Sequence, residues 1–136
     1  MNSPLLGKVI VEALLASGVQ DVLLAPGSRN APISLALHAA EAAGLLRLHV
    51  RIDERVASFT ALGMAKASGR VVAVATTSGT AVGNLVPAAM EARASGIPLL
   101  LLTAGGLGAW LLGHRIVSGT WPDRAVTTLD AVGSTT

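Results

Sequence analysis

Short apolar runs alternate with longer stretches of helical periodicity over most of the chain. Four runs have the length of strands and cover residues 21–25, 46–52, 71–76 and 98–103. Helical patterns precede or separate them at about residues 4–16, 32–43, 54–67 and 80–95. Strands that alternate with helices of this length form right-handed crossovers and a parallel sheet. The pattern therefore predicts an α/β fold of three layers, with helices on both faces of a parallel sheet.

Glycines and prolines mark the ends of these helices. Gly18, Gly44, Gly69 and Gly96 each follow a helical pattern, at nearly equal spacing, and each precedes an apolar run. A glycine at this position is expected in the left-handed conformation. Ser3 is predicted to cap the first helix, with Pro4 as its first residue. Pro87 is expected to kink the helix over residues 80–95, because proline donates no backbone hydrogen bond.

The second predicted strand differs from the others in its pattern. Arg47, His49 and Arg51 alternate there with apolar residues, whereas residues 71–75 are apolar without interruption. Strands buried on both faces read as continuous apolar runs. The alternation thus predicts a strand at an edge of the sheet, or one that lines a cleft.

Three loops follow predicted strands and lead into helices, at residues 26–30, 53–55 and 77–80. Ligands of parallel sheets bind beyond the carboxyl ends of the strands, where such loops meet. Gly27, Ser28 and Arg29 in the first loop suit an anionic group at a helix N-terminus. The alternative is an ordinary turn in which Asn30 caps the helix.

The other two loops also allow two interpretations. Glu54 either stabilises a helix N-terminus beside Asp53 or hydrogen-bonds a ligand nitrogen in a cleft. In the third loop, Gly79 lets a flat ligand approach closely, or else Ser78 or Thr80 serves only as a helix cap.

Composition narrows the class of protein. Of the 136 residues, 51% are hydrophobic and 13% are charged, which excludes an intrinsically disordered chain. The length suits one domain, and the low charge content indicates that part of its surface is covered by another domain or protein. The net charge is only +2, with one phenylalanine, two tryptophans and no tyrosine, so no nucleic-acid partner is expected. No cysteine is present, and His38, His49 and His114 lack metal-ligand spacing. No metal site is therefore predicted in this chain.

The same reading gives an expectation for location. The start of the chain lacks the pattern of a secretory leader. Residues 94–113 carry no formal charge, but they include five glycines and Pro98, and a spanning helix needs about 20 mostly apolar residues. A cytoplasmic protein without a membrane partner is expected.

Residues 22–32, 49–55 and 76–85 together resemble one family. They are similar to the thiamine-diphosphate-dependent synthases of the menaquinone pathway that make 2-succinyl-5-enolpyruvyl-6-hydroxy-3-cyclohexene-1-carboxylate. The resemblance covers about residues 5–104. It implies an incomplete pyrimidine-binding domain whose full enzyme decarboxylates 2-oxoglutarate and adds the product to isochorismate. That full enzyme is expected to be a homodimer or homotetramer.

The resemblance also implies roles for the loop residues. Glu54 corresponds to the glutamate that hydrogen-bonds N1′ of the cofactor pyrimidine and favours the imino tautomer that removes the thiazolium proton. The residues implied to bind the cofactor are Pro26, Gly27, Glu54, Ser78, Gly79 and Thr80. Ser28 and Arg29 are implied to face the substrate, with Arg29 placed for a carboxylate. Mg²⁺ and the diphosphate belong to another domain of the full enzyme, so only the pyrimidine half of the cofactor is expected here.

The resemblance is lost after residue 104, which divides the chain into 1–104 and a divergent tail, 105–136. The family continues with Asp-Arg-Pro, whereas this chain continues with Gly105 and Gly106. The abrupt change favours a shifted reading frame or a broken gene over gradual divergence. The tail is expected to be poorly ordered, with only a weak signal for a strand at residues 125–129. The chain alone is expected to be inactive and to self-associate through uncovered apolar surface.

Besides an inert, truncated product without a function of its own, two other functions remain open from the sequence. One is a non-catalytic, flavodoxin-like module that binds a ligand, although such a module has little use for Glu54. The other is the corresponding domain of a different thiamine-diphosphate enzyme.

Overall fold

The computed structural model describes residues 3–104, which form alternating helices and strands. The helices are α1 (Ser3–Ala16), α2 (Ala31–Ala42), α3 (Glu54–Ser68), α4 (Thr80–Gly83) and α5 (Val86–Ala94). The strands are β1 (Asp21–Leu24), β2 (Arg47–Val50), β3 (Val72–Thr76) and β4 (Leu99–Thr103). The predicted alternation is confirmed, with most boundaries shifted by one or two residues.

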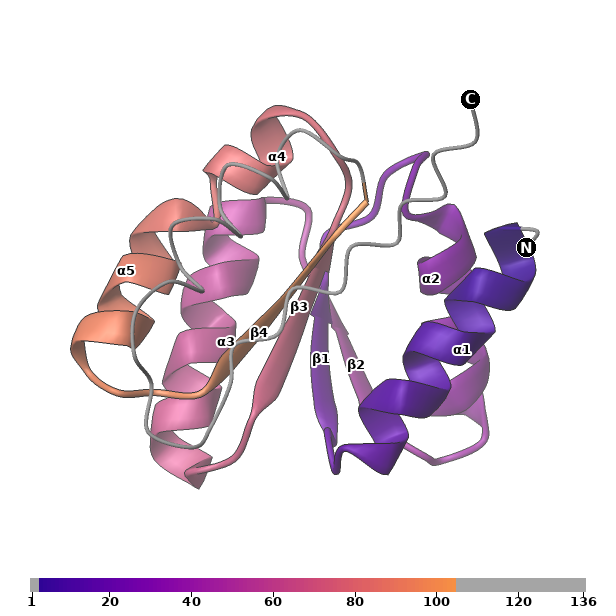
Figure 1. Cartoon of the computed structure of the whole chain (residues 1–136), viewed down its shortest axis with the longest axis horizontal. Helices are drawn as coiled ribbons and strands as arrows, with labels where there is room; N and C mark the ends of the chain where they lie inside the picture. Colours follow the sequence, from indigo (N-terminus) through magenta and orange to yellow (C-terminus); the bar gives the residue numbers. More distant parts are fainter. Residues whose placement is uncertain (1–2, 105–136) are drawn as a thin grey trace.

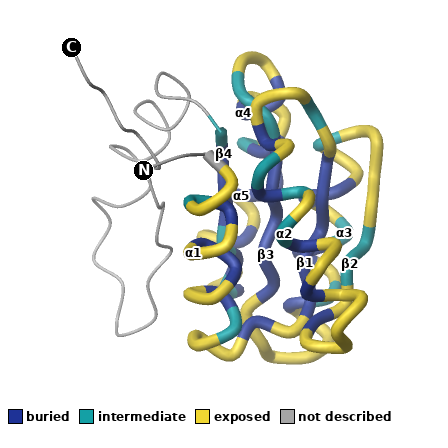
Figure 2. Tube along the Cα trace, turned by 90° about the vertical axis from the view of Figure 1, so that its right-hand side faces the viewer, coloured by how far each residue is buried: buried dark blue, intermediate teal, exposed yellow. Residues whose placement is uncertain are grey.

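The four strands form one parallel sheet in the order β2-β1-β3-β4. Helices α1 and α2 cover one face, and α3 and α5 cover the other (Figure 1). The three-layer α/β fold is thus confirmed. Strand β2 lies at an edge and is partly exposed, as its alternating pattern predicts (Figure 2).

Two hydrophobic clusters hold the layers together, one on each face of the sheet. Successive residues of the inner strands serve the two clusters in turn, because side chains alternate along a strand. Leu23 and Val74 pack toward α3 and α5, whereas Val22 and Ala73 pack toward α1 and α2. All four side chains are fully buried. This double burial explains why the inner strands read as continuous apolar runs.

The helix ends match the glycine pattern. Gly18, Gly44, Gly69 and Gly96 have φ angles of 77°, 70°, 66° and 64°, in the left-handed region. Gly69, for example, is the C-cap of α3, and its N–H donates to the carbonyl of Ala65. The glycines therefore end helices for the reason the sequence indicates.

Two local predictions are wrong. Residues 80–95 do not form one kinked helix, because the chain leaves helix α4 at Asn84 and begins α5 at Val86. Pro87 lies in the first turn of α5, where its missing N–H has no helical partner to lose. Ser3 is the first described residue and already lies within α1 rather than at a cap position.

The divergent tail, Trp110, Trp121 and the strand predicted at residues 125–129 lie outside the described residues. Within residues 3–104, no helix is long and apolar enough to cross a membrane.

Candidate functional site

The loops after β1, β2 and β3 lie at the carboxyl edge of the sheet, where α2, α3 and α4 begin (Figure 1, top). The first and third loops are in direct contact. Arg29 Nη1 donates a hydrogen bond to Ser78 Oγ over 3.0 Å. A Cβ on Gly27 would lie 2.6 Å from the Cβ of Thr77, so only glycine fits against the third loop there. The structure thus brings together two loops that the sequence separates by about fifty residues.

Asn30 organises the first loop from inside. Its side chain is fully buried, its Oδ1 accepts from Gly27 N at 2.7 Å, and its Nδ2 donates to the carbonyl of Ala25 at 2.9 Å. Asn30 occupies the N-cap position of α2, as the alternative interpretation predicts, but its side chain makes no cap hydrogen bond to the helix. A buried amide must have its hydrogen bonds satisfied, and here those bonds fix the turn that presents Ser28 and Arg29.

Glu54 is the first residue of α3, but another carboxylate caps that helix. Asp53 Oδ1 accepts from Val56 N at 2.9 Å, which is the ordinary N-cap bond. Glu54 is half-buried, and its Oε2 accepts from Asn84 Nδ2 at 3.0 Å. Helix capping therefore does not occupy the Glu54 side chain, although its charge still lies near a favourable helix end.

Asn84 is a residue that sequence reasoning missed. It lies just after α4, 30 positions from Glu54, and no motif of local spacing connects the two. The break between α4 and α5 turns its side chain toward the N-terminus of α3.

The third loop is arranged around Gly79, whose φ is 81°. Neither Ser78 nor Thr80 caps α4, since no side-chain cap bond is present and Gly79 occupies the N-cap position. No atom of the described residues lies within 4 Å of a Cβ built on Gly79, so this part of the chain leaves the space beside it open. Pro26, Ser28 and Thr80 are exposed at the same edge.

Two buried hydroxyls lie beneath these loops. Thr76 and Thr103 are register partners at the ends of β3 and β4, and neither Oγ1 has a hydrogen-bond partner among residues 3–104. Side chains alternate between the two faces along a strand. Thr76 therefore lies on the same face as Val72 and Val74, and Thr103 on the same face as Leu99 and Leu101, which is the face that α3 covers. Their burial could not be inferred from the sequence.

The opposite edge of the sheet holds a charged cluster around Asp21. Its carboxylate accepts from Arg47 Nε at 2.7 Å and from Arg47 Nη2 at 2.5 Å, with His49 Nε2 at 3.1 Å and Arg70 Nη2 at 3.6 Å. The hydrogen bonds from Arg47 hold the pKa of Asp21 below its ordinary value, against the opposing effect of burial. The polar residues of β2 thus pair with β1. Over the described part of the chain, no three potential ligands lie close enough to hold a metal ion.

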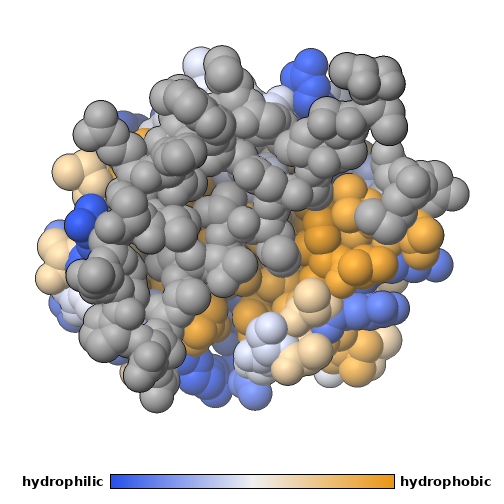
Figure 3. Space-filling model, in the orientation of Figure 1, coloured by the Kyte–Doolittle hydropathy of each residue, from blue (hydrophilic) through white to orange (hydrophobic). Residues whose placement is uncertain are grey.

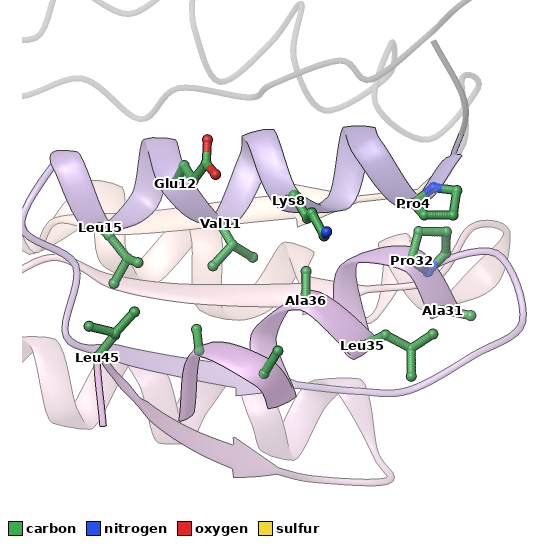
Figure 4. Close-up of a pocket in the computed structure, with 12 residues that line it drawn as sticks. Pro4, Lys8, Val11, Glu12, Leu15, Ala31, Pro32, Leu35, Ala36 and Leu45 are labelled. Atoms are coloured by element: carbon green, nitrogen blue, oxygen red, sulfur yellow. The ribbon is translucent and has the colours of Figure 1, made fainter. Parts of the chain in front are cut away.

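An apolar groove of about 460 Å³ runs between α1 and α2 (Figure 4). Val11 and Leu15 point from α1 toward α2, where Ala36 faces them (Figure 4). The surface on this side of the molecule is strongly hydrophobic (Figure 3). None of the residues predicted to bind cofactor or substrate lines this groove.

Comparison with known proteins identifies the family. The model for the N-terminal TPP-binding domain of thiamine pyrophosphate enzymes matches residues 5–109. The chain belongs to the thiamine pyrophosphate enzymes. The match is therefore to this family and not to the flavodoxin-like module considered as an alternative. The resemblance seen in the sequence is confirmed.

Close relatives of this thiamine pyrophosphate enzyme domain share the name 2-succinyl-5-enolpyruvyl-6-hydroxy-3-cyclohexene-1-carboxylate synthase. The protein of Mycobacteroides abscessus is 60% identical over 95 residues, which are 70% of this chain and 18% of the relative. The protein of Paenarthrobacter aurescens is 60% identical over 97 residues, 71% of this chain and 17% of the relative. The protein of Nocardia farcinica is 57% identical over 97 residues, which are 71% of this chain and 18% of the relative. The chain thus spans less than a fifth of the length of these relatives.

Proposed function

We propose that this chain forms the pyrimidine-binding side of a 2-succinyl-5-enolpyruvyl-6-hydroxy-3-cyclohexene-1-carboxylate synthase, and that Glu54 is its cofactor-binding carboxylate. The proposal rests on the hydrogen bonding of the Glu54 side chain. Asp53 caps α3 in its place, Asn84 holds Oε2, and Oε1 has no hydrogen-bond partner among residues 3–104. A half-buried carboxylate with one oxygen available suits a ring nitrogen that shares a proton with it.

The neighbouring loops fit a flat heterocycle. Gly79 leaves open space at a positive φ, and Gly27 lies against Thr77 without a side chain of its own. Pro26, Ser78 and Thr80 would border the same ring. Thiamine diphosphate, when bound, supplies the carbon centre at which 2-oxo acids lose carbon dioxide. The role of this chain is to hold the pyrimidine and to exchange a proton at Glu54 Oε1.

Ser28 and Arg29 would face the substrates, which we take to be 2-oxoglutarate and isochorismate. Both are carboxylates, and a guanidinium binds a carboxylate through charge-assisted hydrogen bonds. Arg29 donates one N–H to Ser78 and is an exposed residue. Mg²⁺ and the diphosphate would be held by parts of the full enzyme that this chain does not span, so the chain alone would show no turnover.

Thiamine, which carries the aminopyrimidine without the diphosphate, is the probe that tests this site. We expect millimolar thiamine to shift the backbone amide signals of Gly27, Thr77 and Gly79 in NMR spectra of the full 136-residue chain. Glu54→Gln should raise the dissociation constant about ten- to a hundredfold, because a hydrogen bond to a charged group contributes about 1.5–3 kcal/mol.

Glu12→Gln is the matched control, since Glu12 is exposed on α1 beside the apolar groove. It removes the same charge and should leave thiamine binding unchanged. Shifts that are absent, or equal in the chain and in Glu54→Gln, would contradict the proposal.

A further inference from the structure

We propose that Asn84 is a positioning residue for Glu54. Its side-chain amide holds Oε2, so that Oε1 is the oxygen presented to a ligand. The inference rests on the proposed function of Glu54 as the carboxylate that binds the pyrimidine. It concerns a residue outside the three loops at the carboxyl ends of the strands.

The chemistry of the pair determines which atoms meet. An ionised carboxylate only accepts hydrogen bonds, so the amide must turn its Nδ2 toward Glu54. The Asn84 Nδ2 to Glu54 Oε2 distance of 3.0 Å is that of a normal hydrogen bond. A bond to an ionised acceptor is stronger than one between neutral groups, which allows Asn84 to select one orientation of a long, rotatable side chain.

The backbone around Asn84 is well anchored. Its N–H donates to the carbonyl of Thr80 at 3.3 Å, and the next residue, Leu85, is fully buried in the cluster beneath α3. Val82, two residues before Asn84, is also buried and only 2% exposed. Asn84 is itself exposed, so its side chain adds little to the hydrophobic core. The turn that carries Asn84 is thus held by buried residues on both sides, which suits a residue that supports a site.

The hydrogen bond from Asn84 should favour binding by lowering the conformational entropy of the free Glu54 side chain. A free glutamate side chain samples several rotamers, and a ligand that needs one of them must oppose that freedom. Asn84 removes part of this cost before the ligand arrives. Loss of the bond should therefore weaken pyrimidine binding without unfolding the chain.

Two substitutions separate the hydrogen bond from the shape of Asn84. Asn84→Asp keeps the shape but replaces the donor with a carboxylate that repels Glu54, and Asn84→Leu removes the donor without adding charge. Arg93→Gln is the control, because Arg93 is an exposed residue in the last turn of α5. Circular dichroism on the full chain checks that all variants remain folded.

The first measurement is the rotamer distribution of Glu54, from three-bond NMR couplings in the chain without ligand. We expect one dominant rotamer in the chain and in Arg93→Gln, and averaged couplings in both Asn84 variants. The second measurement is the thiamine dissociation constant. It should rise about three- to tenfold in Asn84→Leu, more in Asn84→Asp, and stay unchanged in Arg93→Gln.

Couplings that are averaged already in the unsubstituted chain, or unchanged in the Asn84 variants, would overturn the inference. So would averaged couplings combined with unchanged thiamine affinity in Asn84→Leu. If thiamine binds to none of the proteins, the proposed function fails, and the couplings alone decide whether Asn84 positions Glu54.

Discussion

Polar side chains buried in this domain organise the two edges of its sheet. Asn30 is fully buried at the carboxyl edge and satisfies the backbone of a loop, whereas Asp21 is 5% exposed at the amino edge and pairs with cations. Each would destabilise the fold if left without partners, because a buried polar group that loses its hydrogen bonds loses its compensation for desolvation. The partners of Asn30 therefore help to hold its loop in place, and those of Asp21 help to hold the opposite edge of the sheet.

The lowered pKa of Asp21 predicts a specific dependence of stability on pH. Its ordinary value is 3.8, and the hydrogen bonds from Arg47 lower the pKa in the folded state. The carboxylate thus stabilises the fold fully above the unfolded value and loses this contribution as the pH falls through the lowered, folded value. Urea denaturation between about pH 7 and pH 2 should show the loss below pH 4.

Asp21→Asn removes the titrating group and supplies the comparison. Its free energy of unfolding should be about 1–2 kcal/mol lower at pH 7, and the difference from the unsubstituted chain should shrink toward acid pH. A constant difference at every pH would show that Asp21 does not stabilise the fold through its charge.

At the scale of elements, the close packing of α1 on α2 depends on Gly7. A Cβ at this position would overlap the backbone carbonyl of Pro32, which cannot rotate away. Gly63 in α3 is also a helical glycine, but no atom of residues 3–104 lies within 4 Å of a Cβ built there. The same substitution should thus have opposite effects at the two sites.

Gly7→Ala should lower the free energy of unfolding by about 1–3 kcal/mol, the usual cost of overpacking. Gly63→Ala should raise it by about 0.5–1 kcal/mol, because alanine favours the helix. Thermal and urea denaturation measure both variants under the same conditions. Equal effects of the two substitutions would contradict the close contact between α1 and Pro32.

At the scale of the whole molecule, apolar side chains remain uncovered beside Glu54. Ile52, Val56 and Phe59, here called the α3 stripe, are 84%, 50% and 44% exposed. Clustered exposed apolar residues commonly mark surfaces that meet another protein. We expect the chain to self-associate in proportion to its concentration, as the low content of charged residues also suggests.

Sedimentation velocity across a concentration series tests the α3 stripe. Phe59→Glu should shift the distribution toward the monomer, because it places a charge within the stripe. Met90→Glu is the control, since Met90 is 67% exposed on α5, outside the stripe. If both variants change the distribution equally, net charge rather than the α3 stripe controls association.

The sequence by itself determined the order of elements, the parallel sheet and the polar pattern of β2, which left an edge position or a cleft open. It also determined the three loops at the carboxyl ends of the strands. These features follow from local causes, since hydrophobic periodicity reflects burial of one or both faces, and glycines such as Gly69 reflect a positive φ. The separate helices α4 and α5 were missed because Pro87 is compatible with either a kink or a helix start.

Only the tertiary structure decided which side chains meet. Glu54 and Asn84 are 30 positions apart, Arg29 and Ser78 are 49 apart, and Asp21 and Arg47 are 26 apart. The crossovers and the register of parallel strands create these contacts, and no pattern of neighbouring residues encodes them. The same reason applies to Asn30. The sequence indicates only a helix cap, whereas the structure shows a buried side chain that hydrogen-bonds within its own loop.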